Sequence, residues 1–593
     1  MNVGFPLLGT AIQVEEGTLV SEACRLAGAP LNLVCGGNGT CNKCRVDVME
    51  DGHTRSVLGC QHVVSEGMEI LVAAEEGSHQ LLESVKEATY ELAPAIRRVA
   101  IPRTELKTSM GSHDFTCLAD ALQRHASITP ETPDYATMLL LEHEYRSGEG
   151  ALLNVVLDGN RIVDLVGADE ELAVYGAAVD IGTTSVVVFL FDLLTCKLLG
   201  RASALNGQCA FGADVISRIE HAGGSSENLK AEQAAIMKTV DELLGKLCEE
   251  HGVARQGIYE MVYCGNSTMQ HLFLALDPKP LGRSPFTGVV AHEFAMPASS
   301  GSIAINPRGK HVYMPLIGGY VGADTLACML ELPAGGDGVR MMIDLGTNCE
   351  VSIGNDERTM VASTACGPAL EGAGLSMGMR AKEGAIETAC AEDGQIVIGV
   401  IGDAAPVGLC GSGIIDVVAM LLAEGIVNKK GAFLKGRKLE AHPWHDKVRE
   451  DEERGRYFVL VEASENPNGQ EIYITQKDIR AIQLAKAAIY TGCEILVRNY
   501  GTPREDIEEI CLAGAFGNYI DIEHAQSIGL IPKYGEVPVR SMGNGAGLGV
   551  QRYLVSQPER ARAEYVRMHA THVELADDPD FTDVYLSSMS FGA

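Results

Sequence analysis

The chain has 593 residues, of which 46% are hydrophobic and 21% charged, so its size predicts two to four domains rather than one core. Acidic residues outnumber basic residues by 79 to 47, and the formal net charge of −32 argues against nucleic-acid or anionic-membrane partners, because like charges repel. No apolar stretch approaches the roughly 18 residues that span a bilayer, the N-terminus lacks a signal-peptide pattern, and the 17 cysteines are scattered through apolar segments, so we expect a cytoplasmic protein.

A glycine-rich loop with closely spaced cysteines, LNLVCGGNGTCNKCRVDV, occupies residues 31–48. Five residues separate Cys35 from Cys41, two separate Cys41 from Cys44, and Cys60 follows after fifteen more. Thiolates that converge on an iron–sulfur cluster need a loop that wraps closely and turns its N–H groups inward, and glycine permits this. Zinc sites usually have two C-x2-C pairs, and a thioredoxin-like C-x-x-C opens a helix. Here one pair lies in a loop, so we favour four cysteine ligands of a cluster over zinc or thiol chemistry.

The segments around this loop resemble a plant-type two-iron ferredoxin. Residues 18–28 have the pattern of a short amphipathic helix, and 45–52 and 68–74 have the pattern of strands. A strand, a helix, a cysteine loop and two strands follow one another in this order in a small β-grasp ferredoxin. The resemblance implies a two-iron two-sulfur cluster in a domain that covers residues 1–76.

Two segments without a chemical motif come next. Residues 77–94 are polar, and we interpret them as a helical linker that ends at a proline. Residues 95–172 are expected to form a small middle α/β domain, with a helix at 118–126 and a hairpin at 151–167. We assign this domain no catalytic role.

The remaining residues, 173–593, contain one motif twice. AAVDIGTTSVVVFLFD at 177–192 and MMIDLGTNCEVSIG at 341–354 share an apolar residue, Asp, an apolar residue, Gly and Thr, followed by an apolar strand. Each copy predicts a β-hairpin with polar groups at its tip. A single Asp-x-Gly-Thr is weak evidence, but two copies in one chain favour a functional repeat over two structural turns.

The hairpin tips carry groups suited to the phosphates of a nucleotide and to Mg²⁺. Asp180 and Asp344 could hold Mg²⁺ through its water shell. The glycines would let backbone N–H groups approach phosphate oxygens, and the hydroxyls and amide would donate further hydrogen bonds. These residues are Gly182, Thr183 and Thr184 in the first copy and Gly346, Thr347 and Asn348 in the second.

This repeat resembles the phosphate hairpins of the actin, Hsp70 and sugar-kinase ATPase superfamily. The resemblance implies a two-lobed, ribonuclease H-like domain that binds ATP, with Gly514, Ala515 and Phe516 in the turn that packs on adenosine. It also implies that Asp324, near the start of a helix that joins the lobes, orients the attacking water. Asp214 is a second candidate for that role. For both aspartates a helix cap remains the alternative.

Over nearly its whole length the sequence resembles the ATP-dependent reductive activators of corrinoid proteins. The matching segments include CGGNGTCNKCRV, GNSTMQHLF, GLCGSGIID, LAGAFGNYIDIEHAQSIGLIP and MGNGAGLG, although Asn42 replaces a glycine that is usual between two cluster ligands. The resemblance implies that ATP hydrolysis drives reduction of an inactive cobalt(II) corrinoid methyl-carrier protein to cobalt(I). It further implies a low-potential electron donor (a ferredoxin, a flavodoxin or a reductase) and a homodimer.

Two other functions stay open from the residues alone. One is a small-molecule kinase of the sugar-kinase type, against which the cysteine-bearing N-terminal region argues. The other is a redox sensor or binding module in which ATP sets only the conformation. The segment 428–457, which contains HPWHD, is charged, and we interpret it as a solvated insertion rather than a metal site.

Overall fold

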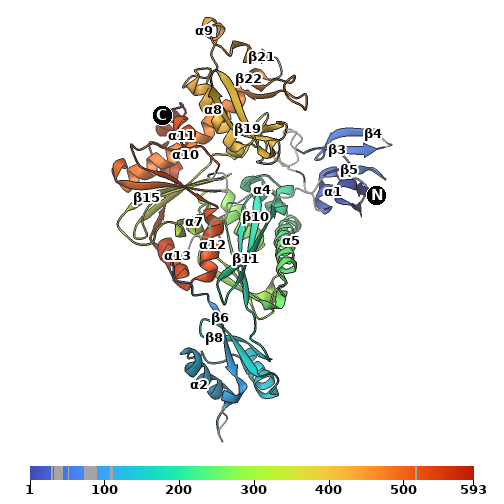
Figure 1. Ribbon diagram of the computed structural model, residues 1–593, viewed down its shortest axis with the longest axis vertical. Coiled ribbons are helices and arrows are strands. Elements are labelled where there is room, and N and C mark those ends of the chain that lie inside the picture. Colours follow the sequence, from blue (N-terminus) through green and yellow to red (C-terminus); the bar gives the residue numbers. More distant parts are fainter. Residues whose placement is uncertain are drawn as a thin grey trace.

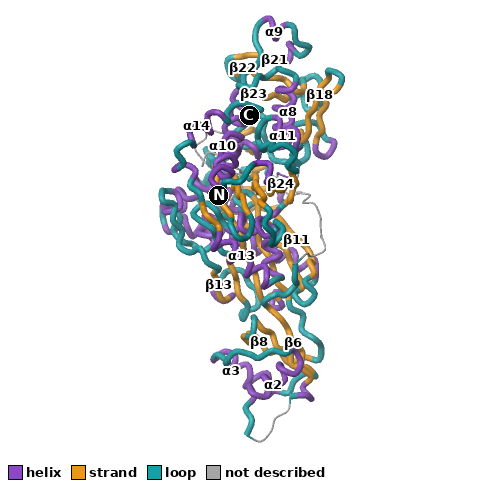
Figure 2. Tube along the Cα trace, turned by 90° about the vertical axis from the view of Figure 1, so that its left-hand side faces the viewer, coloured by secondary structure: helices purple, strands orange, loops and turns teal. Residues whose placement is uncertain are grey.

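The computed structural model describes residues 1–27, 31, 44–50, 53–72, 90–106, 111–346, 348–514, 517 and 519–592. The predicted linker helix at 77–94 lies largely outside the described residues. The two views show an elongated molecule with the sheet of β6 and β8 at one end and α9 with β21 at the other (Figures 1 and 2). Among the helices that the structure describes, none combines the length and the apolar character needed to cross a membrane.

The N-terminal region is a five-stranded mixed sheet in the order β2-β1-β5-β3-β4, with one helix packed against it. The central strand β5 runs parallel to β1 and antiparallel to β3. Alternate residues of RVDVME point into the core, where Val48 and Ile70 are fully buried. The elements are β1 (Asn2–Phe5), β2 (Thr10–Gln13), α1 (Val20–Leu26), β3 (Arg45–Glu50), β4 (His53–Leu58) and β5 (Glu69–Leu71).

The region after the linker is a three-stranded antiparallel sheet, β6-β7-β8, covered by two helices. Leu118 and Leu122 of the first helix pack on Leu153 of the sheet. The predicted hairpin turns at Gly159, which has a φ of +61°. The elements are β6 (Ile96–Pro102), α2 (Asp114–Ala126), α3 (Tyr135–Leu140), β7 (Leu152–Asp158) and β8 (Arg161–Ala168).

The first lobe is a six-stranded sheet in the order β11-β10-β9-β12-β14-β13. β9 pairs antiparallel with β10 and parallel with β12, whose residues are all buried, as expected of a central parallel strand. The strands are β9 (Tyr175–Ile181), β10 (Ser185–Asp192), β11 (Lys197–Leu205), β12 (Ile258–Gly265), β13 (Phe294–Pro297) and β14 (Lys310–Tyr313). The helices are α4 (Val215–Gly224), α5 (Ser226–His251) and α6 (Ser267–Phe273).

The second lobe repeats this arrangement with the sheet β25-β24-β15-β16-β17-β26. β15 pairs antiparallel with β16 and parallel with β24, as β9 does with β10 and β12. The strands are β15 (Val339–Leu345), β16 (Cys349–Gly354), β17 (Thr359–Thr364), β24 (Ile507–Ala513), β25 (Val539–Gly543) and β26 (Ala570–His572). The helices α10 (Gln476–Tyr500) and α14 (Phe581–Ser587) lie against each other, and α10 also covers β16 and β17.

Two small sheets extend the second lobe between β17 and α10. One contains β18 (Ala385–Glu392), β19 (Gln395–Val400) and β20 (Gly408–Leu409), and the other β21 (Val448–Asp451), β22 (Gly455–Val461) and β23 (Ile472–Thr475). The accompanying helices are α8 (Gly411–Ala423) and α9 (Arg437–Glu440), with α11 (Ile522–Ser527) from later in the chain beside α8.

One interpretation of this part of the sequence is wrong. Trp444, in the segment taken as a solvated insertion, is only 5% exposed and belongs to the core of the second lobe. Its indole N–H donates to the carbonyl of Gly394 at 2.9 Å, and its ring lies 5.9 Å from that of Phe458. The charged residues of the segment lie on its solvated outer face. On its inner face, Trp444 contacts both small sheets.

Three helices connect the lobes: α7 (Ala323–Leu330), α12 (Gly545–Val555) and α13 (Gln557–His569). α7 leads from the first lobe to the second, whereas α12 and α13 lead back and complete the core of the first lobe. α7 and α12 lie against each other, and α12 also contacts β9 and β12. The two repeated hairpins, β9–β10 and β15–β16, therefore meet at these crossing helices.

Candidate functional site: a carboxylate cluster between two hairpins

Asp180 and Asp344 occupy the same position in the two hairpins. Each is the second-to-last residue of its strand, β9 or β15, directly before the turn. Both carboxylates act electrostatically on Asp324, since burial and then the charges of Asp344 and Asp180 raise its pKa. That these three side chains form one nucleotide site stays a prediction.

The tip of the first hairpin is tightly held. A Cβ atom on Gly182 would lie 2.7 Å from the carbonyl oxygen of Ser185, so this position requires glycine. Thr183 is buried, and its hydroxyl accepts a hydrogen bond from the Asn266 amide at 3.0 Å. The hydroxyl of Thr184 donates across the cleft to Glu371 of the second lobe at 3.5 Å.

The second hairpin contacts the turn that was predicted to pack on adenosine. Gly514 has a φ of +94°, and a Cβ atom there would lie 2.4 Å from the carbonyl oxygen of Leu345 and 3.0 Å from Oδ1 of Asp344. Gly346 accepts a hydrogen bond from the Cys366 thiol at 3.6 Å, and Asn348 follows the turn. Thr347, Ala515 and Phe516 lie outside the described residues.

Burial raises the pKa of both hairpin aspartates to about 6. The amide of Asn544 and the thiol of Cys264, 3.7 Å from Oδ1, partly oppose this at Asp180. At Asp344 the opposing group is the thiol of Cys328, 3.5 Å from Oδ2. Each hairpin aspartate therefore has a buried thiol as a hydrogen-bond donor.

Asp324 is the second residue of α7, and its Oδ1 accepts a hydrogen bond from the backbone N–H of Thr325 at 2.8 Å. Burial, and then the charge of Asp344, raises its pKa to about 7. Asp324 is therefore a buried carboxylate in the first turn of α7 and not its cap, because the N-cap residue is Gly322 and no side-chain cap hydrogen bond is present.

A fourth acid, Glu350 on β16, was missed in the sequence. It is 7% exposed and accepts a hydrogen bond from the Ser363 hydroxyl at 3.0 Å. Burial, and then the charges of Asp324 and Asp344, raises its pKa well above the usual range. The available signal was its place inside CEVSIG, a strand of otherwise small or apolar residues that is buried throughout.

Asp180, Asp324, Asp344 and Glu350 form a cluster of buried acids whose charges raise one another's pKa values. Among the described residues, no basic side chain contributes to the pKa shifts of these four acids. Gathered buried carboxylates without a basic partner are costly unless a cation compensates them, and oxygen ligands that can bind through water suit Mg²⁺. Among the residues that the structure describes, no three acidic, histidine or cysteine side chains stand close enough together to hold a metal ion directly, so Mg²⁺ here would be held through its water shell and by the phosphates of a nucleotide.

Asp214 is placed differently. It precedes α4 as the N-cap residue, and its Oδ1 accepts a hydrogen bond from the backbone N–H of Ser217 at 2.9 Å. The Ser217 side chain returns a contact to the backbone of Asp214, which completes a capping box. Its carboxylate is not among the groups that shift the pKa values of the four cleft acids. The geometry corresponds to the helix-cap alternative for this residue.

Comparison with known proteins assigns the chain to a family. Residues 175–333 match the family model of the RACo middle region, and residues 338–593 match that of the C-terminal ASKHA domain of RACo. The sequence is 49% identical over 593 residues to the corrinoid activation enzyme RamQ of Eubacterium limosum, covering 100% of this chain and 99% of that protein. The chain belongs to the RACo family of corrinoid activators.

Two further members or neighbours agree with this assignment. A solved structure described as a reductive activator for corrinoid, iron-sulfur protein superposes with a TM-score of 0.74 and is 31% identical, covering 100% of this chain and 98% of the other. A reductase of the cobalt(II) methylated amine-specific corrinoid protein from Methanosarcina barkeri is 26% identical over 471 residues, 70% of this chain and 77% of that protein. The predicted family and fold class are confirmed.

In this RACo-family chain, two of the four cysteines predicted to hold a cluster lie side by side. Cys44 directly precedes β3 and Cys60 follows β4, and the backbone N–H of Gly59 donates to the carbonyl of Cys44 at 2.9 Å. The two residues are 2% and 3% exposed, and the Gln61 amide lies 3.9 Å from the Cys60 sulfur. Two buried cysteines on adjoining stretches of backbone, one of them with an amide N–H near its sulfur, fit iron–sulfur ligation. Cys35 and Cys41 lie outside the described residues.

The end of α7 that is remote from Asp324 joins the two lobes of this activator. Arg562 of α13 contacts both carboxylate oxygens of Asp356, in the β16–β17 turn, at 3.0 Å each. The same guanidinium donates to the carbonyls of Leu330 and Leu332 at 2.9 Å. We call the Arg562–Asp356 pair the hinge contact.

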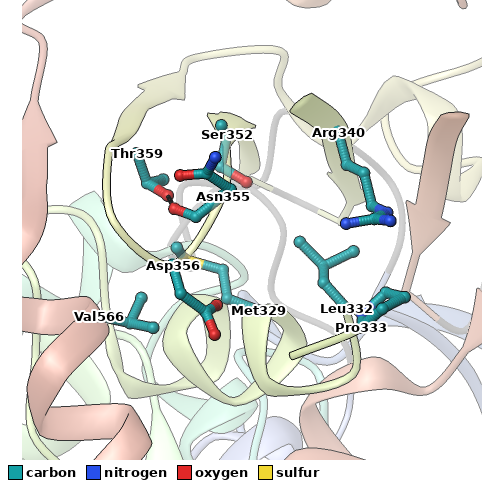
Figure 3. A pocket seen from close by; sticks show the side chains of 10 residues that line it. Met329, Leu332, Pro333, Arg340, Ser352, Asn355, Asp356, Thr359 and Val566 are labelled. Atoms are coloured by element: carbon teal, nitrogen blue, oxygen red, sulfur yellow. Dashed lines mark hydrogen bonds between the residues drawn. The ribbon is translucent and has the colours of Figure 1, made fainter. Parts of the chain in front are cut away.

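A small cavity lies beside the hinge contact. Figure 3 shows Asn355, Asp356 and Thr359 of the β16–β17 turn facing Met329 and Leu332 at the end of α7. The cavity holds about 10 Å³, which is room for about one water molecule and not for a nucleotide. The contacts around this cavity therefore connect the two lobes rather than line a nucleotide site.

Proposed function

We propose that this protein is an ATP-dependent reductive activase of corrinoid proteins, which reduces cobalt(II) in a corrinoid methyl-carrier partner to cobalt(I). One electron is added to cobalt, and ATP with water gives ADP and phosphate. The observation that carries the proposal is the cluster of buried acids between two phosphate-type hairpins, in a chain whose N-terminal fold places Cys44 beside Cys60. A site for ATP and a site for an electron carrier are thus combined in one RACo-family chain.

Different residues of the two repeated hairpins bind the different parts of Mg-ATP. Asp180 and Asp344 hold Mg²⁺ through its water shell, and Asp324 orients the attacking water. The two hairpin tips bind the phosphates, and the turn that begins at Gly514 binds adenosine. The residues are Gly182, Thr183 and Thr184; Gly346, Thr347 and Asn348; and Gly514, Ala515 and Phe516.

The cysteines at positions 35, 41, 44 and 60 hold a two-iron two-sulfur cluster in this proposal, and the cluster supplies a one-electron carrier when bound. The chain divides at the predicted boundaries: a ferredoxin-like domain at 1–76, a linker at 77–94, a middle domain at 95–172 and the ATPase domain at 173–593. A low-potential ferredoxin, flavodoxin or reductase supplies the electron, and the protein acts as a homodimer.

The need for ATP follows from energetics. Transfer that is uphill by about 200 mV for one electron would cost about 4.6 kcal/mol, at 59 mV for each factor of ten. Closure of two lobes on a nucleotide can supply differential binding of this size, because binding energy is available only to the state that the nucleotide prefers. The buried acids repel one another when no cation is bound. They therefore favour closure of the two lobes only when the cation is present.

The test is an anaerobic reduction assay. The reconstituted, reduced protein is mixed with a cobalt(II) corrinoid protein, and cobalt(I) is followed by its absorption with and without Mg-ATP. We expect cobalt(I) only with ATP. Cys44→Ala and Asp344→Asn should each abolish it, while the matched controls Cys24→Ala, in the core of the same domain, and Asp120→Asn, on the exposed face of α2, should retain it.

Each unexpected result of this assay points to a different interpretation of the protein. Stable phosphorylation of an added small molecule would favour a kinase. An intact cluster and ATPase that reduce no corrinoid protein would favour a sensor or binding module. Cobalt(I) formation that does not depend on ATP would contradict the proposed role of the carboxylate cluster.

A further inference from the structure

The tip of the first hairpin is held from behind by one stretch of chain, which we call the 206–218 segment. Three successive carbonyl oxygens of the tip are engaged by it. The Asn206 amide donates to Gly182 at 2.8 Å, and the Asn206 backbone N–H donates to Thr184 at 2.9 Å. Asn206 is fully buried, so these bonds do not compete with water.

Arg218 supplies the third of these contacts. Its Nη2 donates to the carbonyl of Thr183 at 2.6 Å, and its Nε donates to the carbonyl of Gly212 at 2.9 Å. The side chain is fully buried, and its hydrogen-bond partners among the described residues are carbonyls and sulfur atoms rather than carboxylates. The charge of Arg218 also acts on the buried carboxylate of Glu232, where it opposes the rise in pKa that burial causes. Its hydrogen bond to the Thr183 carbonyl, directly behind a phosphate hairpin, suits Arg218 to position the hairpin tip.

The same segment also reaches the ferredoxin-like domain. α1 of that domain lies against residues 207–210, and the guanidinium of Arg25 lies over the ring of Phe211, 5.5 Å from its centroid. The Phe211 ring stacks on His221 at 4.8 Å, and His221 pairs with the buried Glu232 at 2.8 Å.

We propose that the 206–218 segment couples nucleotide binding at the first hairpin to docking of the ferredoxin-like domain, with Arg218 as the residue that positions the hairpin tip. The inference rests on the proposed function, because it places ATP at that tip. When nucleotide moves the hairpin tip, Arg218 and Asn206 move with it through their hydrogen bonds to the tip. Phe211 lies between these two residues in the chain and therefore moves as well. The contact between Arg25 and Phe211 is a single cation–π pair, weak enough to be released when the segment shifts.

The coupling can be tested by amide hydrogen exchange in the complete, cluster-loaded protein, with and without a non-hydrolysable Mg-ATP analogue. We expect the analogue to change exchange at 180–184, at 206–218 and at 20–26. In Phe211→Ala and in Arg25→Ala the change at 180–184 should remain while that at 20–26 is lost. Arg55→Ala, an exposed arginine of the same domain that pairs with Glu50, is the control and should behave as the wild type.

Two results would overturn the coupling while leaving the proposed function intact. One is a response at 180–184 with none at 20–26 in the wild type, and the other is a response at 20–26 that survives Phe211→Ala. A missing response at 180–184 itself would overturn the nucleotide site and the coupling together. The three patterns are distinguishable within one experiment.

Arg218 is tested separately through nucleotide affinity. We expect Arg218→Met to raise the dissociation constant of the Mg-ATP analogue by about tenfold or more and Arg218→Lys to restore part of it, because the buried charge is retained. Because coupling is reciprocal, Arg25→Ala should change the same constant by about two- to fivefold, since coupling through one cation–π pair cannot exceed the energy of that pair. Unchanged affinity in an Arg218→Met variant that melts at the wild-type temperature would refute the positioning role.

Discussion

The thiol of Cys328 donates a hydrogen bond to Oδ2 of Asp344 at 3.5 Å, from the helix that joins the two lobes. The first lobe repeats the pairing, with the thiol of Cys264 at 3.7 Å from Oδ1 of Asp180. The thiols come from different elements, a helix and a strand, so the internal repeat of the fold does not by itself produce them. Both act in the same direction, since each lowers the pKa of its aspartate against the effect of burial.

Removal of the Cys328 thiol should weaken binding of Mg-nucleotide in a pH-dependent way. In Cys328→Ala the pKa of Asp344 rises further, so a smaller fraction of this carboxylate is charged near its present value of about 6. We expect affinity to fall by about threefold to tenfold there, the value of one hydrogen bond, and less at higher pH. Titration of the nucleotide at several pH values measures this. Cys493→Ala, a buried thiol of α10, is the control, and parallel pH profiles in both variants would contradict the prediction.

Without nucleotide and metal, the folded protein should lose stability as the pH rises from about 4 to about 7. The pKa values of Asp180, Asp324 and Asp344 are raised in the folded state, to about 6, 7 and 6. In this interval the folded protein binds more protons than the unfolded chain, so the free energy of unfolding falls with pH. Added Mg-nucleotide binds the charged carboxylates and should therefore stabilise more at high pH. Thermal unfolding with EDTA and with Mg-nucleotide checks both trends, and Asp324→Asn should flatten the first.

Asp324→Asn separates the two interpretations of this residue. The amide oxygen can still accept the Thr325 N–H, so the first turn of α7 keeps this hydrogen bond, whereas orientation of the attacking water by a carboxylate is lost. We expect the turnover number for ATP hydrolysis to fall about a hundredfold or more, with little change in nucleotide affinity. The melting temperature at neutral pH should not fall, because the substitution removes a buried carboxylate whose raised pKa costs stability there. Steady-state ATPase assays and melting curves provide the measurements. A variant that hydrolyses ATP at the wild-type rate would reduce Asp324 to a structural role.

Gly514→Ala should destabilise the protein more than Gly501→Ala. Both glycines have positive φ, +94° and +80°, so both substitutions incur the cost of about 1–2 kcal/mol for an L-residue in that region. Only at Gly514 does the added methyl group approach another atom, the carbonyl oxygen of Leu345 at 2.4 Å; at Gly501 nothing lies within 4 Å. Urea denaturation gives the difference. Equal losses would mean that the turn at Gly514 can move away from the second hairpin freely.

The sequence predicted the hairpins and the elements around them because both depend on local pattern. Asp180 and Asp344 were found through a repeated motif, and the strands at 45–52 and 151–167 through alternation and turn residues. The family followed from motifs spread along the chain and is confirmed by the comparisons.

What the sequence did not predict depends on contacts between distant elements. Glu350, Cys264 and Cys328 gain their roles from neighbours far away in the chain, and no local pattern shows which side chains converge. Trp444 was misread for the converse reason, because its charged neighbours in sequence hide the apolar core that it fills. Asp214 has the same residue type and spacing whether it caps a helix or faces the cleft, so only the geometry separates the two.

The hinge contact holds one end of α7, so a rotation at that contact moves the other end of the helix, where Asp324 lies. α7 has eight residues and is about 12 Å long, so a rotation of about 10° at Arg562 and Asp356 would displace its far end by about 2 Å. Mg²⁺ demands a near-ideal octahedron with bonds of about 2 Å, and its tolerance is much smaller than that displacement. If the carboxylate cluster holds Mg²⁺ as proposed, the bound ion would be compatible with only a narrow range of orientations of the two lobes.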